Sequence, residues 1–200
     1  MSYPAENPIL QIGFRPHVFL TGDLQCGKTT IIRTILAKLP KTYCLAGFST
    51  FFVQQNAQSD VQAETKYLYI ADINSPPRTD SANEMKNHRL VVERSNKKTT
   101  IYTENFNTYA VKLIQNKPAN IIIMDECGRF ESDCETFKQA VFSCLQEDIP
   151  ILGTVRKLHY PSWLDDIKNH QNVLLIDVHK KNISEIIEAL FAWLKNRYTE

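Results

Sequence analysis

The feature that most constrains this chain is the segment GDLQCGKTT at residues 22–30. Residues 22–29 match the pattern G-x-x-x-x-G-K-[ST], in which glycines let the backbone fold back so that successive N–H groups surround an anion. The apolar run at 18–20 is typical of a buried strand, and apolar residues recur at helical spacing from Thr29 to Leu39. A strand, this loop and a helix in that order predict a phosphate site at the positive end of the helix.

The residue types within the loop predict what it binds. Lys28 is expected to reach the β- and γ-phosphates of a nucleotide, and the Thr29 hydroxyl to coordinate Mg²⁺. The pattern requires neither Asp23, whose carboxylate is repulsive near phosphates, nor Cys26, which we interpret as a small filler with an oxidisable thiol beside Lys28. The predicted nucleotide-binding residues are Gly22, Asp23, Leu24, Gln25, Cys26, Gly27, Lys28, Thr29 and Thr30.

Strand-like and helix-like segments alternate before and after the middle of the chain. Further apolar runs occur at 43–48, 121–124, 151–155 and 173–178. Segments with helical spacing separate them, and such alternation predicts a mainly parallel sheet with helices on both faces. We therefore expect an α/β, three-layer fold of the P-loop NTPase type.

The helices of the last third have recognisable start signals. Ser132 with Glu135, and Asn182 with Glu185, have the spacing of capping boxes at the beginning of two helices. A short helix is predicted over 163–169.

Residues 51–110 differ in character from the rest. They contain a polar stretch at 54–62, strand-like segments at 67–70, 90–93 and 99–102, and turn signals at 74–80 and 95–98. Short strands separated by turns predict an antiparallel insertion. We place this insertion within a single domain that spans residues 1–200.

A second chemical feature is the segment IIIMDECG, a buried strand that ends in Asp125 and Glu126. A carboxylate at this position, as in a Walker B motif, can hold the Mg²⁺ that Thr29 also coordinates. The adjacent Glu126 is placed to orient or deprotonate an attacking water, which favours hydrolysis over transfer to an acceptor. An ordinary strand ending in a charged turn is the alternative, but the phosphate loop makes it the weaker one.

Additional positive charge is expected near the transferred phosphate. Arg129 and Arg156 both follow strands whose carboxyl ends meet at the expected binding edge, so both are candidate catalytic residues beside Lys28. Surface salt bridges are an equally good explanation for each. Arg78 and Arg89 in the insertion are weaker candidates for closing over the phosphates.

Composition and net charge limit which binding partners and which cellular compartment are expected. The net charge is +1 and the pI about 7.6, which gives no strong signal for nucleic acid. There is no apolar run long enough to span a membrane and no signal-peptide pattern at the start, so a cytoplasmic protein is expected. The five cysteines show no CxxC pairing, which favours reduced thiols and argues against a zinc site.

The segments GDLQCGKTT, IIIMDECGRFES and ILGTVRK together resemble the thermostable/cancer-related nucleoside-triphosphatase family, over roughly residues 17–195. The resemblance implies slow, Mg²⁺-dependent hydrolysis of ATP, GTP and other nucleoside triphosphates to diphosphate and phosphate. It also implies roles for Gly128 and Arg129, where the family usually has lysine and then methionine after the glycine. The segment STFFVQQNAQSD lacks the acidic residues and the basic-glycine turn that the family tends to have there.

Two other functions fit the same motifs. A nucleotide or small-molecule kinase shares the loop, and the polar insertion would then cover an acceptor pocket. A nucleotide-gated accessory protein with little turnover of its own would act through a protein partner. Acceptor-dependent turnover distinguishes the first of these from a hydrolase, and stimulation by a partner distinguishes the second.

Overall fold

The computed structural model describes residues 12, 15–55, 65–75, 87–95, 98–157, 162–179 and 182–197. The strands are β1 (His17–Thr21), β2 (Leu45–Gln55), β3 (Thr65–Asp72), β4 (His88–Arg94), β5 (Thr99–Ile101), β6 (Ile121–Cys127), β7 (Ile151–Val155) and β8 (Val173–Asp177). The helical segments are α1 (Lys28–Lys38), α2 (Thr103–Asn105), η3 (Phe106–Ala110), α3 (Val111–Ile114), α4 (Glu135–Cys144), α5 (Trp163–Lys168) and α6 (Ile183–Arg197).

The strands of the described residues form a single sheet in the order β5-β4-β3-β2-β6-β7-β1-β8. The pairs β2–β6, β6–β7, β7–β1 and β1–β8 are parallel. On the other side of β2 the sheet continues through β3, β4 and β5, each antiparallel to the strand before it. This arrangement confirms the predicted fold class. Because β7 lies between β1 and β6, the strand before the phosphate loop does not pair with the strand that ends in the acidic residues.

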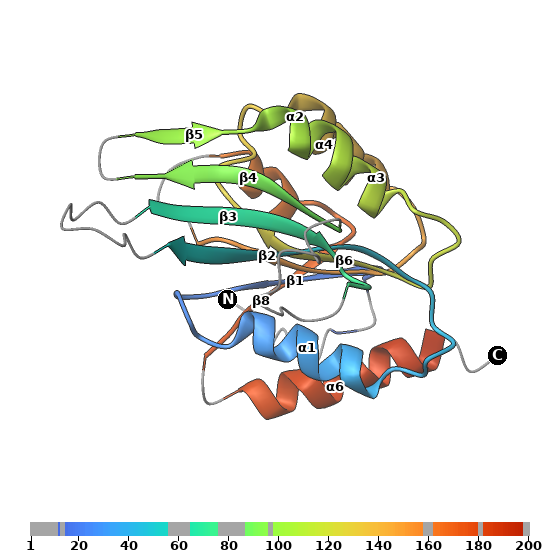
Figure 1. The fold of residues 1–200 in the computed structure, drawn as a ribbon. Helices are drawn as coiled ribbons and strands as arrows, with labels where there is room; N and C mark the ends of the chain where they lie inside the picture. Colours follow the sequence, from blue (N-terminus) through green and yellow to red (C-terminus); the bar gives the residue numbers. More distant parts are fainter. Residues whose placement is uncertain are drawn as a thin grey trace, which may run out of the picture.

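Helices cover both faces of the sheet, and each face has its own apolar core. Figure 1 shows α1 and α6 together on one face and α2, α3 and α4 on the other. Ile35 of α1 and Leu190 of α6 belong to the first core. Phe106, Phe137 and Trp163 belong to the second, where the Phe137 ring lies 5.9 Å from Phe106 and 6.1 Å from Trp163. No helix in the described part of the chain is long and apolar enough to cross a membrane.

The antiparallel region is built differently from the prediction in two respects. It shares β2 with the parallel part, because this strand runs on to Gln55 instead of ending near residue 48. Its antiparallel strands end at Ile101, and residues 103–114 form a continuous helical segment that we did not predict. Burial of Phe106, Ala110, Leu113 and Ile114 along one side explains this segment, and their spacing is a helical signal.

The predicted capping box at Ser132 is wrong. The helix α4 begins at Glu135 after Cys134, whose carbonyl accepts the Lys138 N–H at 3.0 Å. The Ser132 hydroxyl instead donates to the Arg129 carbonyl at 2.7 Å. A tight turn over 129–132 therefore uses this hydroxyl before the helix starts.

The capping box predicted at Asn182 and Glu185 is only partly correct. The Asn182 carbonyl accepts the Ile186 N–H at 3.0 Å, so this residue does precede α6. Its side chain does not cap the helix: it accepts the His179 N–H at 2.9 Å and donates to the Asp177 carbonyl at 3.1 Å. These bonds join Asn182 to Asp177 and His179 at the end of β8, beside the phosphate loop.

Candidate active site

The phosphate loop connects β1 to α1 and depends on its two glycines. Gly22 and Gly27 have φ angles of 134° and 114°, which side chains disfavour. A Cβ on Gly22 would lie 2.7 Å from the Val178 carbonyl oxygen, and one on Gly27 would lie 2.9 Å from a carbon of Ile183. The close approach of the Val178 backbone therefore requires glycine at 22, and the positive φ angle requires it at 27.

Lys28 folds back over this loop. Its Nζ donates to the Gly22 carbonyl at 3.0 Å and to the Asp23 carbonyl at 2.9 Å. The lysine is thus held by backbone oxygens at the N-terminus of α1, where an anion would be bound.

The remaining loop side chains mostly face solvent. Asp23, Leu24 and Gln25 are exposed, and Leu24 is 78% exposed. Cys26 is partly buried against the core under α1, and its Sγ lies 3.5 Å from the Lys28 Nζ. Cys26 therefore fills space beneath the loop, and the loop offers a ligand its backbone more than its side chains.

Asp125 meets the phosphate loop at the end of β6. Its Oδ1 accepts hydrogen bonds from the Thr29 hydroxyl at 3.2 Å and from the Thr154 hydroxyl at 3.0 Å. Its side chain is almost fully buried, and burial raises the pKa of this carboxyl to about 6, while the two hydroxyl bonds oppose the shift. Sequence reasoning missed Thr154, whose signal is a polar residue within the apolar strand ILGTV.

Glu126 forms an ion pair with Arg156, in which the Arg156 Nε donates to the glutamate Oε1. Both side chains are about 30% exposed, so the pair lies at the surface of the site. Arg129, by contrast, is exposed, and its guanidinium lies 5.1 Å from the centroid of the Phe130 ring. Of the two arginines predicted, the structure brings Arg156 to the acidic pair and leaves Arg129 on the outside of the turn.

A buried carboxyl that we did not predict supports this arrangement. Glu131 is 3% exposed and accepts the Gly128 N–H at 3.0 Å, while the Gly128 carbonyl accepts the Trp163 indole N–H at 3.0 Å. Burial raises the pKa of Glu131 to about 7. Nothing in the sequence distinguishes Glu131 from the exposed acidic residues around it.

The weaker candidates lie elsewhere. Arg89 is held 4.9 Å from the centroid of the Tyr109 ring, on the antiparallel side of the sheet. Arg78 lies outside the described residues. Thr30 follows Thr29 in the first turn of α1, where it is exposed.

Together, the strand order, the glycine loop and the carboxylate that meets its threonine define a P-loop NTPase fold. A model of the family described as NTPase matches residues 17–191. The chain belongs to this NTPase family, as the resemblance in its motifs predicted.

Several curated proteins and solved structures that are named nucleoside triphosphatases are similar to this chain over most of its length. Nucleoside-triphosphatase THEP1 of Methanocaldococcus jannaschii is 26% identical over 191 residues, which cover 89% of this chain and 99% of that protein. The THEP1 of Thermotoga sp. strain RQ2 is 20% identical over 186 residues, which cover 89% of this chain and 95% of that protein. The crystal structure of THEP1 from Aquifex aeolicus superposes with a TM-score of 0.61 at 18% identity, covering 90% of this chain and 99% of that one. The solution structure of a human cancer-related nucleoside triphosphatase superposes with a TM-score of 0.52 at 19% identity, covering 90% of this chain and 97% of that one.

Proposed function

We propose that this protein is a Mg²⁺-dependent nucleoside triphosphatase that hydrolyses ATP, GTP and other nucleoside triphosphates to diphosphate and phosphate. The observation that supports this most directly is the 3.2 Å contact between the Thr29 hydroxyl and the Asp125 carboxylate. This contact joins the phosphate loop to Asp125. Glu126 is the next residue along the chain, so it lies close to the place where the loop would bind phosphates. The names of the curated relatives support the same reaction class.

The residues at this contact fit Mg²⁺. Thr29 and Asp125 offer two hard oxygen atoms, and within the described residues no cluster of three or more His, Cys, Asp or Glu side chains is placed to hold a metal. Magnesium typically uses one or two protein oxygens and completes its shell with water and substrate phosphates. Thr29 and Asp125 would hold the ion, which when bound would supply positive charge beside the β- and γ-phosphates.

Lys28 and the loop backbone bind the phosphates in this proposal. The lysine Nζ is now satisfied by two loop carbonyls, and phosphate oxygens would take their place as acceptors. The N–H groups at the start of α1 complete the cradle. Because the loop side chains 23–25 are exposed, this binding is directed to phosphates and leaves base selectivity to other parts of the chain.

Glu126 and Arg156 act on the attacking water and on the developing charge. The Glu126 carboxylate accepts the proton of the water whose oxygen attacks the γ-phosphorus, and the bond to the bridging β,γ-oxygen breaks. Arg156, held beside Glu126 by their ion pair, stabilises the charge that accumulates on the γ-phosphoryl oxygens.

Phosphate release from ATP, GTP, CTP and UTP, measured with Mg²⁺ and with EDTA, tests the activity. We expect release to require Mg²⁺. The Glu126→Gln variant should still bind nucleotide but hydrolyse it at least about 100-fold more slowly, the size of effect expected for a lost acid–base group. Glu135→Gln, which removes an exposed carboxylate paired with Lys138, is the matched control and should retain activity. Unchanged turnover in Glu126→Gln would remove this residue from the role assigned to it.

A further inference from the structure

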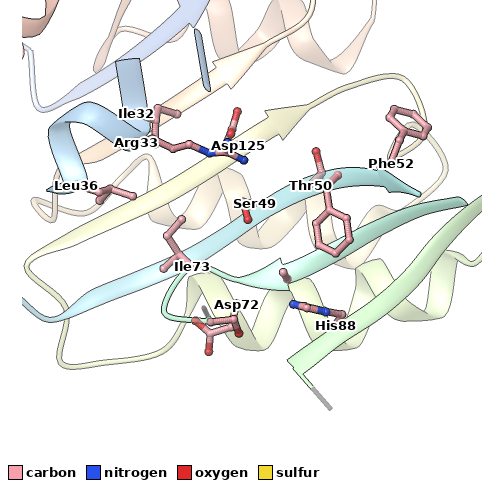
Figure 2. Close-up of a pocket in the computed structure, with 13 residues that line it drawn as sticks. Ile32, Arg33, Leu36, Ser49, Thr50, Phe52, Asp72, Ile73, His88 and Asp125 are labelled. Atoms are coloured by element: carbon pink, nitrogen blue, oxygen red, sulfur yellow. The ribbon is translucent and has the colours of Figure 1, made fainter. Parts of the chain in front are cut away.

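A cavity opens next to the site but is separate from the phosphate loop. It has a volume of about 680 Å³ and lies between α1 and the strands β2, β3 and β4 (Figure 2). Asp125 lines one end of it, but none of the loop residues 22–30 does. In the strand order the cavity lies on the β2 side of β6, whereas the loop follows β1 on the other side. A volume of this size is typical of small-molecule sites.

The end of the cavity near Asp125 carries a positive charge. Figure 2 shows the Arg33 side chain extending from α1 toward Asp125. Arg33 makes no hydrogen bond or ion pair within the described part of the chain, but its charge acts on the nearby Asp125 and lowers the pKa of that carboxyl. The other acidic side chain of the cavity, Asp72, is already engaged, because its Oδ1 accepts the Asn74 N–H at 2.8 Å and the Asn74 side-chain amide at 3.0 Å. An anionic group is therefore the ligand that Arg33 suits, and a guanidinium binds phosphate well.

The far end of the cavity is aromatic. The Phe51 ring stacks on Tyr69 with centroids 5.7 Å apart and meets the His88 ring edge-on at 5.1 Å. These contacts hold Phe51 as a rigid surface, and Phe52 beside it is 43% exposed. Rigid aromatic surfaces bind planar bases by stacking.

Hydroxyl groups lie between the two ends. Ser49 is the neighbour of Asp125 in the register of β2 and β6, and Thr50 follows it toward the aromatic rings. Figure 2 shows both between Arg33 and Phe52. The cavity thus presents in turn a cation, polar groups and aromatic rings, which matches the phosphate, sugar and base of a nucleotide with one phosphate.

We propose that this cavity is a second ligand site, which binds a nucleoside monophosphate while a triphosphate occupies the phosphate loop. The monophosphate places its phosphate at Arg33 and its base against Phe51. The two ligands then approach Asp125 from opposite sides of β6. This inference concerns binding and does not depend on the hydrolytic activity proposed above.

Isothermal titration calorimetry of AMP, GMP, CMP and UMP tests the site. The protein is first saturated with Mg²⁺ and the non-hydrolysable ATP analogue AMP-PNP, which fills the loop. We expect at least one of the monophosphates to bind with a Kd below about 1 mM. Arg33→Gln should weaken that binding at least tenfold, and because Arg33 is exposed on α1 its replacement leaves the packing of the helix intact. Phe51→Leu should also weaken it.

Two controls separate this site from the loop. Lys38→Gln removes another positive charge from α1, outside the cavity, and should leave monophosphate binding unchanged. Lys28→Ala should weaken binding of AMP-PNP but not of the monophosphate. The proposal is overturned if none of the monophosphates binds. It is also overturned if the bound monophosphate is displaced by AMP-PNP and lost in Lys28→Ala, because the loop is then its site. A protein that binds the monophosphate but releases no phosphate from triphosphates would contradict the proposed hydrolysis alone.

Discussion

Replacing Glu131 by glutamine is expected to change how the stability of the fold depends on pH. The carboxyl of Glu131 is 3% exposed and accepts the Gly128 N–H. Burial disfavours its charged form and raises its pKa from 4.5 to about 7. Glutamine has the same shape and can still accept the Gly128 N–H, but it has no charge to bury.

The sign and size of the effect follow from these values. Between pH 4.5 and 7 the native state binds more protons at Glu131 than the unfolded chain does. The contribution of this group to the free energy of unfolding is therefore fully present below pH 4.5 and decreases as the pH rises to 7. At about 1.4 kcal/mol per pH unit, the loss over this interval is about 3 kcal/mol. Relative to the wild type, Glu131→Gln should gain about that much stability between pH 4.5 and pH 8.

Urea unfolding at pH 4.5, 6 and 8, followed by the fluorescence of Trp163 and Trp193, measures this difference. EDTA is included so that metal binding at Asp125 does not contribute. Titration of groups distant from Glu131 affects both proteins equally and cancels in the comparison. Glu135→Gln, at an exposed carboxylate, should track the wild type at every pH. A constant stability difference between Glu131→Gln and the wild type across this range would refute the reasoning.

Three further predictions test neighbouring features. Burial lowers the pKa of His17 from 6.5 to about 4, so its contribution to stability should be lost as the pH falls through that range, by about 3 kcal/mol, and His17→Gln should remove this loss in urea unfolding. Arg156→Gln should slow phosphate release by about 100-fold while Arg129→Gln changes it less than about threefold, because only the former pairs with the acidic site. Thr154→Val removes a hydrogen bond that lowers the pKa of Asp125, so the acid limb of the kcat/KM profile should move to higher pH, and Thr154→Ser should restore it.

Local sequence patterns predicted much of the fold because each depends on short-range physics. The glycines of the loop are required by backbone angles, and the parallel strands were found from continuous apolar runs that only a doubly covered sheet can bury. The helical segment 103–114 has regular apolar spacing, but most of it falls within the range 51–110 that the preceding strand and turn patterns assign to an antiparallel insertion. The capping box at Ser132 failed for a different reason: a competing turn used the same hydroxyl.

The candidate site was predictable only in part. Lys28, Thr29 and Asp125 belong to motifs in which neighbouring residues and flanking elements restrict the position of the side chain, and the structure places Thr29 against Asp125. The choice between Arg129 and Arg156 could not be made in this way. Both follow strands at the same edge, and their side chains are long enough to reach several partners.

By itself, the sequence determined that this chain holds a phosphate loop on a parallel sheet and carries an acidic pair at the end of another strand. These features depend on residue type and spacing, which local backbone geometry translates directly into structure. Only the tertiary structure decided that β7 lies between those strands and brings Thr154 to Asp125 and Arg156 to Glu126. Only the fold, likewise, buries Glu131 and sets Arg33 opposite the aromatic rings of β2. Such contacts join residues far apart in the chain, and their partners are set by how strands and helices pack, which no local pattern records.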